Sequence, residues 1–334
     1  MPAWRVLPAC SLEPFSLPRR AKPAWIASHS AEFRQVARYR IVRTALAVAL
    51  YLTPAAQQPS ATYLDLSVAG VVRVAAAYVK AYQEQLTFLI ADEAYTQQIR
   101  SQIPDDRTPK ARTMKSEVFF MFTPANGDWM AIRDVIEVDR KPVTGRPDLR
   151  TALETLPAAQ VAGAFKASNS RFNIGRTQRN FNEPILSLLV LDARYLPNFT
   201  FERKRVERAA SGTLVTLAFT ETSAPTLIRD LQWRPVFSKG ELVIDAATGR
   251  VHRAQLRVTI GGVSLELTTT YTADERLGLW VPAHFRERYE EGILPPGSAR
   301  TQLENTRSYE ELVCEARYSN YRRFETTARI KKQM

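Results

Sequence analysis

The alternation of side-chain type between Ala254 and Thr268 constrains the fold more than any other feature of this sequence. Apolar residues occupy every second position on both sides of Gly261-Gly262, a dipeptide typical of two-residue hairpin turns; they are Ala254, Leu256, Val258, Ile260, Val263, Leu265 and Leu267. Successive side chains of a strand point to opposite faces. The pattern therefore predicts an antiparallel hairpin with one apolar face and one solvated face.

Period-two patterning continues on both sides of this hairpin, from Phe199 onward. A meander of about seven strands is expected, with a further hairpin loop at 245–249. The flanking strands are expected at 200–208, 213–221, 236–245, 279–290 and 311–329.

Helical patterns precede the meander. Apolar residues at three- and four-residue spacing predict a long amphipathic helix from Val68 to about Arg100. A strand pair is expected at 116–122 and 129–138 around Asn126-Gly127, a helix at 148–168 interrupted near Pro157, and a short helix at 183–193 capped by Asn182. Since a one-sided sheet must cover its apolar face, the chain from 60 to 334 is predicted to be one α+β domain.

The N-terminal region has the parts of a secretory signal peptide at 36–59. Arginines precede eight apolar residues, 45–52, and Pro54 and small residues follow. The apolar run is far shorter than the roughly 20 residues that cross a bilayer. Residues 1–35 would then be a mis-annotated or disordered extension, with translation starting at Val36 or Val42. The alternative is an ordinary buried helix at 41–52.

The net charge of +12 does not by itself indicate nucleic-acid binding. Residues 1–43 hold eight basic and two acidic side chains, which is half of the excess. The remainder is a mild bias, compatible with an anionic membrane surface or ligand. We expect no nucleic-acid partner and no transmembrane span.

Motifs of known chemistry are missing from the sequence. It contains no phosphate-binding glycine loop, no G-x-S-x-G and no H-E-x-x-H. Cys314 alternates with Leu312 and Ala316, which favours a buried small side chain over a nucleophile. His284 and Cys314 are too few to predict a metal site, and no cofactor is expected. An acid–base pair remains open, because Glu287, Glu290 and Glu291 are close in sequence.

One segment, 170–182, is unusual in combining three arginines, three asparagines and two aromatic residues. Arginine beside aromatic residues suits phosphate or planar anionic groups. The alternative is a hydrogen-bonded loop that ties helix to sheet. The candidate ligand-binding residues, including two tyrosines of the first helix, are Arg171, Asn173, Arg176, Arg179, Tyr78 and Tyr82.

Several stretches resemble those of uncharacterised secreted proteins of acidobacteria-type genomes: 134–143, 171–175, 225–229, 245–251 and 318–324. This resemblance implies export and one shared domain, and no known activity. A helix followed by a long meander is also similar in architecture to the periplasmic lipoprotein-carrier superfamily. That second resemblance implies a curved sheet or half-barrel that holds acyl chains under helices.

Three functions follow as hypotheses. The first is an exported envelope protein, periplasmic or extracellular, that binds a lipid or other amphiphile between sheet and helices. The second is an envelope hydrolase with a carboxylate pair, which would place Asp or Glu side chains together in a cleft. The third is a structural or partner-binding envelope protein with an exposed apolar patch or a bare sheet edge.

Overall fold

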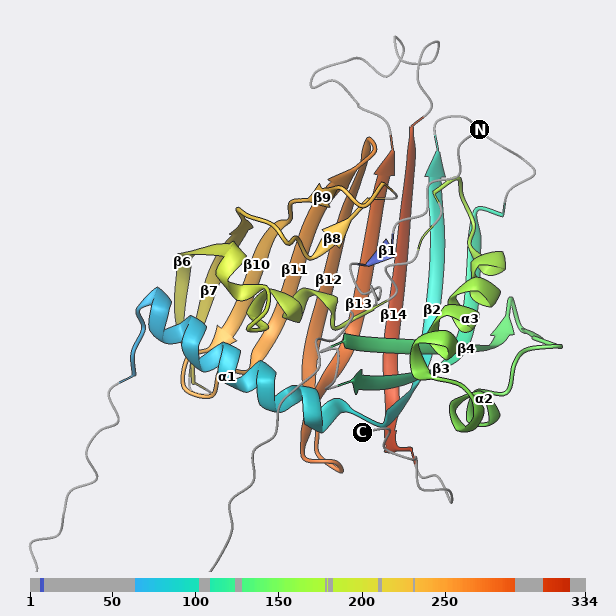
Figure 1. The fold of residues 1–334 in the computed structure, drawn as a ribbon, viewed down its shortest axis with the longest axis horizontal. Coiled ribbons are helices and arrows are strands. Elements are labelled where there is room, and N and C mark those ends of the chain that lie inside the picture. Colours follow the sequence, from blue (N-terminus) through green and yellow to red (C-terminus); the bar gives the residue numbers. More distant parts are fainter. Residues whose placement is uncertain are drawn as a thin grey trace, which may run out of the picture. The chain divides into compact units, whose positions relative to one another are not determined.

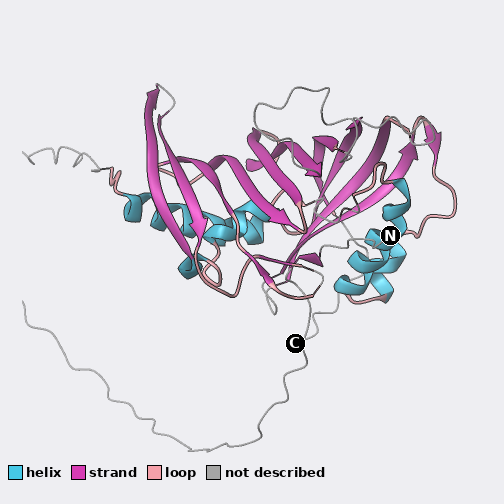
Figure 2. Ribbon diagram, turned by 90° about the horizontal axis from the view of Figure 1, so that it is seen from above, coloured by secondary structure: helices cyan, strands magenta, loops and turns pink. Residues whose placement is uncertain are grey.

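The structure, a computed structural model, describes residues 7–8, 64–101, 109–123, 128–177, 179, 183–209, 212–230, 232–291 and 309–324. Its main feature is an antiparallel sheet of eleven strands that curves without closing (Figures 1 and 2). The strands are β2 (Leu89–Ser101), β3 (Ala111–Thr123), β4 (Asp128–Val138), β5 (Lys141–Pro142), β6 (Phe199–Ala209), β7 (Gly212–Glu221), β10 (Lys239–Asp245), β11 (Val251–Ile260), β12 (Val263–Asp274), β13 (Leu279–Glu291) and β14 (Glu310–Arg323). The predicted α+β fold with a long curved meander is confirmed. The signal peptide predicted at 36–59 and all of 1–35 except Leu7–Pro8 lie outside the described residues.

The strand order shows how the meander is built: β5-β4-β3-β2-β14-β13-β12-β11-β10-β7-β6. From Phe199 onward, seven long strands pair with their neighbours in sequence, as the alternation predicted. Leu256 pairs with Leu267 and Arg257 with Glu266 across the Gly261-Gly262 turn. Both glycines have positive φ, +55° and +88°, where a side chain would be strained. A separate small sheet of order β1-β8-β9 joins β1 (Leu7–Pro8), β8 (Ile228–Arg229) and β9 (Pro235–Val236).

The first helix, α1 (Val68–Leu86), is shorter than predicted. The Ser67 hydroxyl caps its start by accepting a hydrogen bond from the Gly70 N–H at 3.0 Å. It ends where Thr87 becomes extended and Phe88 takes a φ of +63°. The prediction of helix to Arg100 is wrong, because residues 89–101 form β2 between β3 and β14. Among the described residues, no helix is long and apolar enough to cross a membrane.

We call the sheet face that α1 covers the inner face (Figure 2). The inward side chains of α1 pack on it with almost no exposed surface: Val71, Ala75 and Val79 at 0%, Tyr82 and Leu86 at 1%. The sheet contributes one residue in two, as its pleat requires. In this structure α1 therefore closes directly onto the sheet.

The other helices lie in two places. The helix predicted at 148–168 is confirmed as α2 (Leu149–Thr155) and α3 (Ala158–Asn169), divided at Pro157. They pack on Ile90, Phe119 and Ile132, which alternate with inner-face residues and so form a second core on the opposite face. The helix predicted at 183–193 is a 3-10 helix, η2 (Leu186–Leu191), whose six side chains are all buried and which contacts α1.

Candidate functional site

The centre of the inner face holds a buried polar cluster. Gln97, Cys314 and Glu287 lie side by side on β2, β14 and β13. The Glu287 carboxylate has no exposed surface and accepts hydrogen bonds from the hydroxyls of Tyr95 at 2.9 Å and Tyr289 at 2.5 Å. Burial raises the pKa of both phenols far above the ordinary value of 10.0, so both remain donors.

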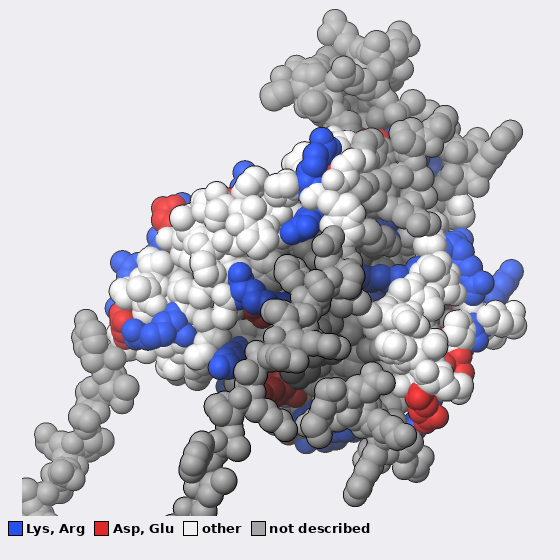
Figure 3. All heavy atoms as spheres, in the orientation of Figure 1, with Lys and Arg blue, Asp and Glu red and all other residues white. Residues whose placement is uncertain are grey.

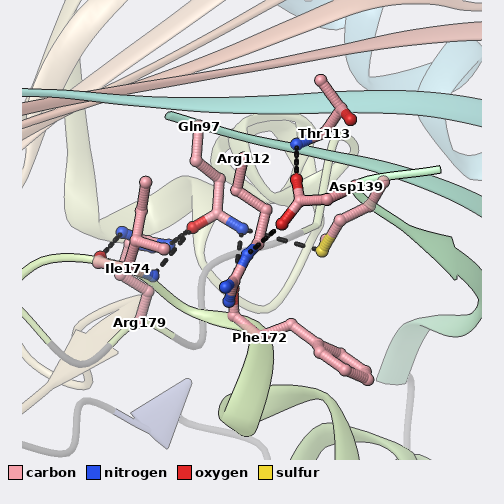
Figure 4. A network of polar contacts seen from close by, with 8 residues as sticks. Gln97, Arg112, Thr113, Asp139, Phe172, Ile174 and Arg179 are labelled. Atoms are coloured by element: carbon pink, nitrogen blue, oxygen red, sulfur yellow. Dashed lines mark hydrogen bonds and ion pairs between the residues drawn. The ribbon is translucent and has the colours of Figure 1, made fainter. Parts of the chain in front are cut away.

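The segment 170–182 docks onto this cluster through Gln97 (Figure 4). The Gln97 Oε1 atom accepts the N–H of Ile174 at 3.1 Å and also contacts Arg179 Nη2. Arg179 is 2% exposed; its Nη1 donates to the Ile174 carbonyl at 3.0 Å and its Nη2 to Asn173 Oδ1 at 3.3 Å. Among the described residues no carboxylate lies within ion-pair distance of Arg179. The Glu287 side chain is also buried nearby.

A second tie holds the same segment to the edge of the sheet. The carbonyl of Phe172 accepts hydrogen bonds from Gln97 Nε2 at 3.1 Å and from Arg112 Nη1 at 2.9 Å. Arg112 in turn donates to Asp139 at 3.2 Å (Figure 4). Much of the segment's polarity therefore serves to attach it to the sheet, as the alternative interpretation expected.

Two predicted ligand residues lie outside the buried cluster. Arg171 is exposed, with its guanidinium 4.7 Å from the Phe172 ring. Arg176 lies between two carboxylates that face each other on paired strands, Glu310 at 3.4 Å and Glu291 at 4.0 Å. Here the chain brings two carboxylates together with one arginine between them, and Arg288 lies in the same way between Glu290 and Glu311.

An ion pair lies on the inner face, and a small cavity lies beside it between β4, α3 and the segment 170–182. Arg133 on β4 is 4% exposed and donates to Glu93 at 2.5 and 2.6 Å. Arg133 and Arg179 line one cavity of about 20 Å³, a volume suited to a single water-sized group. Its other lining residues include Lys166, Asn169 and Ser170 and no acidic residue. Arg133 Nη1 and Arg179 Nε each lack a hydrogen-bond partner among the described residues.

An aromatic cluster lies under the C-terminal half of α1. Tyr78 stacks on Tyr82 at 5.5 Å, Tyr82 lies 5.9 Å from Trp129, and Trp129 lies 5.9 Å from Phe122. The hydroxyls of Tyr78 and Tyr82 and the Trp129 Nε1 are buried and have no partner in the part of the chain that the structure describes. Buried polar atoms are nearly always paired, so three unpaired donors in one aromatic cluster require an explanation. The hydroxyls of these tyrosines make no hydrogen bond to the described residues of the segment 170–182.

Burial sets the properties of Cys314 and His252. Cys314 is 0% exposed, and burial raises the pKa of its thiol from 9.0 to about 12. His252 packs edge-on to Trp280 at 4.8 Å, and burial lowers its pKa below 6.5. The described residues include no group of three or more His, Cys, Asp or Glu side chains that could hold a metal.

Sequence reasoning overlooked several of these residues. Tyr95, Gln97 and Glu93 were assigned to a helix, and Glu287 was grouped with Glu290 and Glu291. Yet Phe285, Glu287 and Tyr289 occupy every second position of β13, and the alternation itself places Glu287 on the apolar face. No comparable sequence signal pointed to Arg133.

Comparison with known proteins gives no family. No family model matches the chain, and no curated protein matches its sequence. Among solved structures, a DUF1329 family protein from Desulfovibrio piger has a TM-score of 0.31 at 10% identity, covering 75% of this chain and 92% of its own. A domain assigned as an outer membrane lipoprotein-sorting protein from Vibrio parahaemolyticus has a TM-score of 0.27 at 12% identity over 78% of this chain and 96% of its own.

A third similar structure is lipovitellin, with a TM-score of 0.27 at 8% identity. It covers 73% of this chain, but this chain matches only 26% of lipovitellin. The lipoprotein-sorting domain is a protein of the kind that the architectural resemblance named. At these TM-scores and identities, none of the three similarities carries information about the function of this chain.

Proposed function

We propose that this protein is an exported envelope protein that binds an amphiphile with an anionic head group where β4, α3 and the segment 170–182 meet. The observation that carries the proposal is the cavity shared by Arg133 and Arg179. Each of these buried guanidiniums has one N–H without a partner among the described residues, and the cavity lining has no acid. Buried donors of this kind suit a carboxylate or phosphate oxygen.

The aromatic cluster supports an apolar part for the same ligand. Tyr82, Trp129 and Phe122 offer apolar ring surface, and the unpartnered donors of Tyr82 and Trp129 suit a ligand with oxygen acceptors. Because α1 packs directly on the sheet, a chain that enters here would displace the helix. Besides apolar contacts, a buried hydrogen bond from Gln83 Nε2 to Asp192 Oδ2 at 2.8 Å and an exposed one from Arg323 Nη1 to the Gln85 carbonyl at 3.0 Å tie the helix to the rest of the fold.

Export is proposed from the sequence alone. The basic residues, short apolar run and small residues at 36–59 are typical of a secretory signal. Determining the N-terminus of the protein from its native cell tests this part. A mature chain that begins near Ser60 is expected, and a chain that retains Met1 would contradict it.

The binding proposal is tested by mass spectrometry of organic extracts from the full chain, expressed with its export signal and purified without detergent. A stoichiometric amphiphile with an anionic head is expected. A folded, monodisperse protein that gives a blank extract and does not bind a fluorescent fatty acid would overturn the proposal.

Variants locate the ligand. Lys166 lines the cavity, is 31% exposed and pairs with Glu183, 10% exposed, at 2.8 Å, so the stability of each Lys166 variant is measured beside its binding. Lys166→Gln is expected to weaken fatty-acid binding. Lys115→Gln is the matched control and should not weaken it, because Lys115 is a 70% exposed side chain of β3 that also pairs with a glutamate, Glu137. Tyr82→Phe removes an unpartnered hydroxyl and should lower affinity without lowering stability.

A further inference from the structure

A second feature, remote in sequence from the cavity of Arg133 and Arg179, is the short hairpin of β8 and β9. Ile228 pairs with Val236 and Arg229 with Pro235. The carboxylate of Asp230 organises the tip: its Oδ1 accepts the N–H groups of Gln232 and Arg234, both at 2.9 Å, and its Oδ2 accepts Arg234 Nε at 2.7 Å. The tip is therefore held in one conformation by its own hydrogen bonds.

This hairpin presents an aromatic side chain to solvent. Trp233 is 46% exposed and has a φ of +61°, a conformation that costs free energy for a bulky residue. Phe237, just after the hairpin, is 51% exposed. These two are the most exposed large apolar side chains among the described residues. A strained backbone that turns a tryptophan outward is the kind of outlier that indicates a functional role.

The base of the hairpin is fixed by a buried glutamate. Glu221, which is 3% exposed, accepts the Leu227 N–H at 2.7 Å through Oε1, and through Oε2 the Ser238 N–H at 2.9 Å and the Ser238 hydroxyl at 2.8 Å. One carboxylate thus joins the start and the end of the excursion to β7. The two exposed aromatic side chains are consequently presented from a rigid base.

Basic side chains surround these aromatic residues. The Arg229 guanidinium lies 6.0 Å from the Trp233 ring, and Arg234 and Lys239 are exposed. A groove of about 900 Å³ runs beside the hairpin, and its lining includes apolar Val236, Phe237, Val258 and Ile260, basic Arg234, Lys239 and Arg257, and acidic Glu221 and Asp230. Asp230 pairs with Arg234 at 2.7 Å and Glu266 pairs with Arg257 at 3.0 Å, so Lys239 is the basic residue of this lining that has no ion pair among the described residues. In Figure 3, basic side chains stand among uncharged surface over the region of β8 and β9.

We infer that this surface, Trp233, Phe237 and their basic neighbours, docks on an anionic lipid bilayer. Tryptophan is enriched at the membrane–water interface because its ring is apolar and its N–H is polar. Lysine and arginine beside it interact favourably with anionic head groups. The combination of two exposed aromatic side chains with flanking cations matches the charge and polarity of such an interface. A protein partner would be expected to meet a larger apolar surface.

A site-specific label tests the inference, since the basic residues of 1–43 could bind anionic vesicles by themselves. Gln232→Cys in a Cys10→Ser background of the full chain carries an environment-sensitive fluorophore at the tip; Cys314 is buried and does not compete. The matched control carries the label at Glu154→Cys, an exposed position of α2. The probe is a vesicle of phosphatidylcholine with about one third phosphatidylglycerol.

The tip label is expected to shift to the blue and brighten on vesicles, and the α2 label to stay unchanged. No response at the tip, or an equal response at both positions, would overturn the inference, the first result favouring a protein partner. The Trp233→Ser/Phe237→Ser variant should lose about tenfold or more in vesicle affinity through the tip, whereas Leu156→Ser, which removes a 45% exposed apolar side chain elsewhere, should not.

The docking inference and the amphiphile-binding proposal can be tested independently of each other. The tip label reports bilayer contact whether or not the protein holds an amphiphile. Lys239→Glu should weaken docking and leave fatty-acid binding unchanged. Lys166→Gln should do the reverse.

Discussion

Arg133 and Glu93 form a bidentate ion pair on the inner face, with Nε–Oε2 at 2.5 Å, Nη2–Oε1 at 2.6 Å and side chains that are 4% and 0% exposed. Removing one partner of such a pair leaves an uncompensated charge in the interior. The pair joins β4 to β2 across β3 and also sets the position of Arg133 at the cavity.

We expect Arg133→Met to lower the free energy of unfolding by about 3–5 kcal/mol, and the double variant Glu93→Leu/Arg133→Met to recover most of that loss. Denaturant titration measures both. The exposed pair of Arg73 and Asp65 is the control, since Arg73→Ala should cost about 0–1 kcal/mol. Equal losses of unfolding free energy for Arg133→Met and Arg73→Ala would show that breaking the buried pair costs no more than breaking an exposed one.

The close approach of Gly249 to α1 allows a test of how tightly the helix packs on the sheet. It has a φ of +73°, and a Cβ there would lie 2.4 Å from the Val74 carbonyl oxygen of α1. Gly262, with a φ of +88°, has nothing within 4 Å of such a Cβ. Gly262→Ala should therefore cost only the backbone strain, about 1 kcal/mol.

Gly249→Ala adds a clash with the helix backbone and should cost about 2–4 kcal/mol. It should also speed hydrogen exchange in α1, which Gly262→Ala should not. If the two variants exchange alike, the helix is not held where the structure has it.

The hydrogen bond between Gln83 of α1 and Asp192 predicts that the stability of the protein depends on pH. Burial alone would raise the pKa of Asp192, but hydrogen bonds from Arg194 and Gln83 outweigh it and leave the pKa below its ordinary value of 3.8. A carboxyl with a lowered pKa in the folded state contributes stability above pH 3.8 and loses it as the pH falls through the lower value.

The stability difference between the natural chain and Asp192→Asn should therefore be largest at neutral pH and shrink below pH 3.8. Denaturation at a series of acidic pH values measures it. Glu84→Gln, on the exposed side of α1, should change stability by less than about 0.5 kcal/mol throughout.

Cys314 is predicted to be unreactive in the folded protein. Because burial raises the pKa of its thiol to about 12, almost no thiolate exists at pH 8. In a Cys10→Ser chain, a thiol reagent should react only after denaturant is added. Above pH 9.0 the unfolded thiol ionises first, so its burial then favours unfolding as the pH rises towards 12. Rapid reaction of the native protein would contradict the buried position.

The sheet was predictable because its alternation is a local property. Leu256 and Leu267 face the core for the same reason that Gly261 and Gly262 turn the chain, and each is visible within a few residues. The end of α1 was not predictable in this way. Leu89 and Ile90 continue the helical spacing, but pairing with β3 and β14 outweighs it, and β14 lies more than 200 residues away.

The candidate site was predictable only in part. The composition of 170–182 pointed to Arg179 and Asn173, and both do line the cavity. Arg133 and Lys166 come from separate elements, β4 and α3, and only the packing of the helix on the strand brings them to the same place. Arg171 and Arg176 have the same composition signal, yet one lies in solvent and the other holds Glu310 and Glu291.

The place of β14 in the strand order has a consequence for how the chain folds during synthesis. Strands β2 to β4 and strands β6 to β13 can each pair within themselves as they leave the ribosome. They join only when residues 310–323 insert between β2 and β13. Until then the nascent chain holds two partial sheets, each with an open edge able to pair with other chains. Any stop codon before Glu310 leaves both edges open permanently, so even late truncations should aggregate.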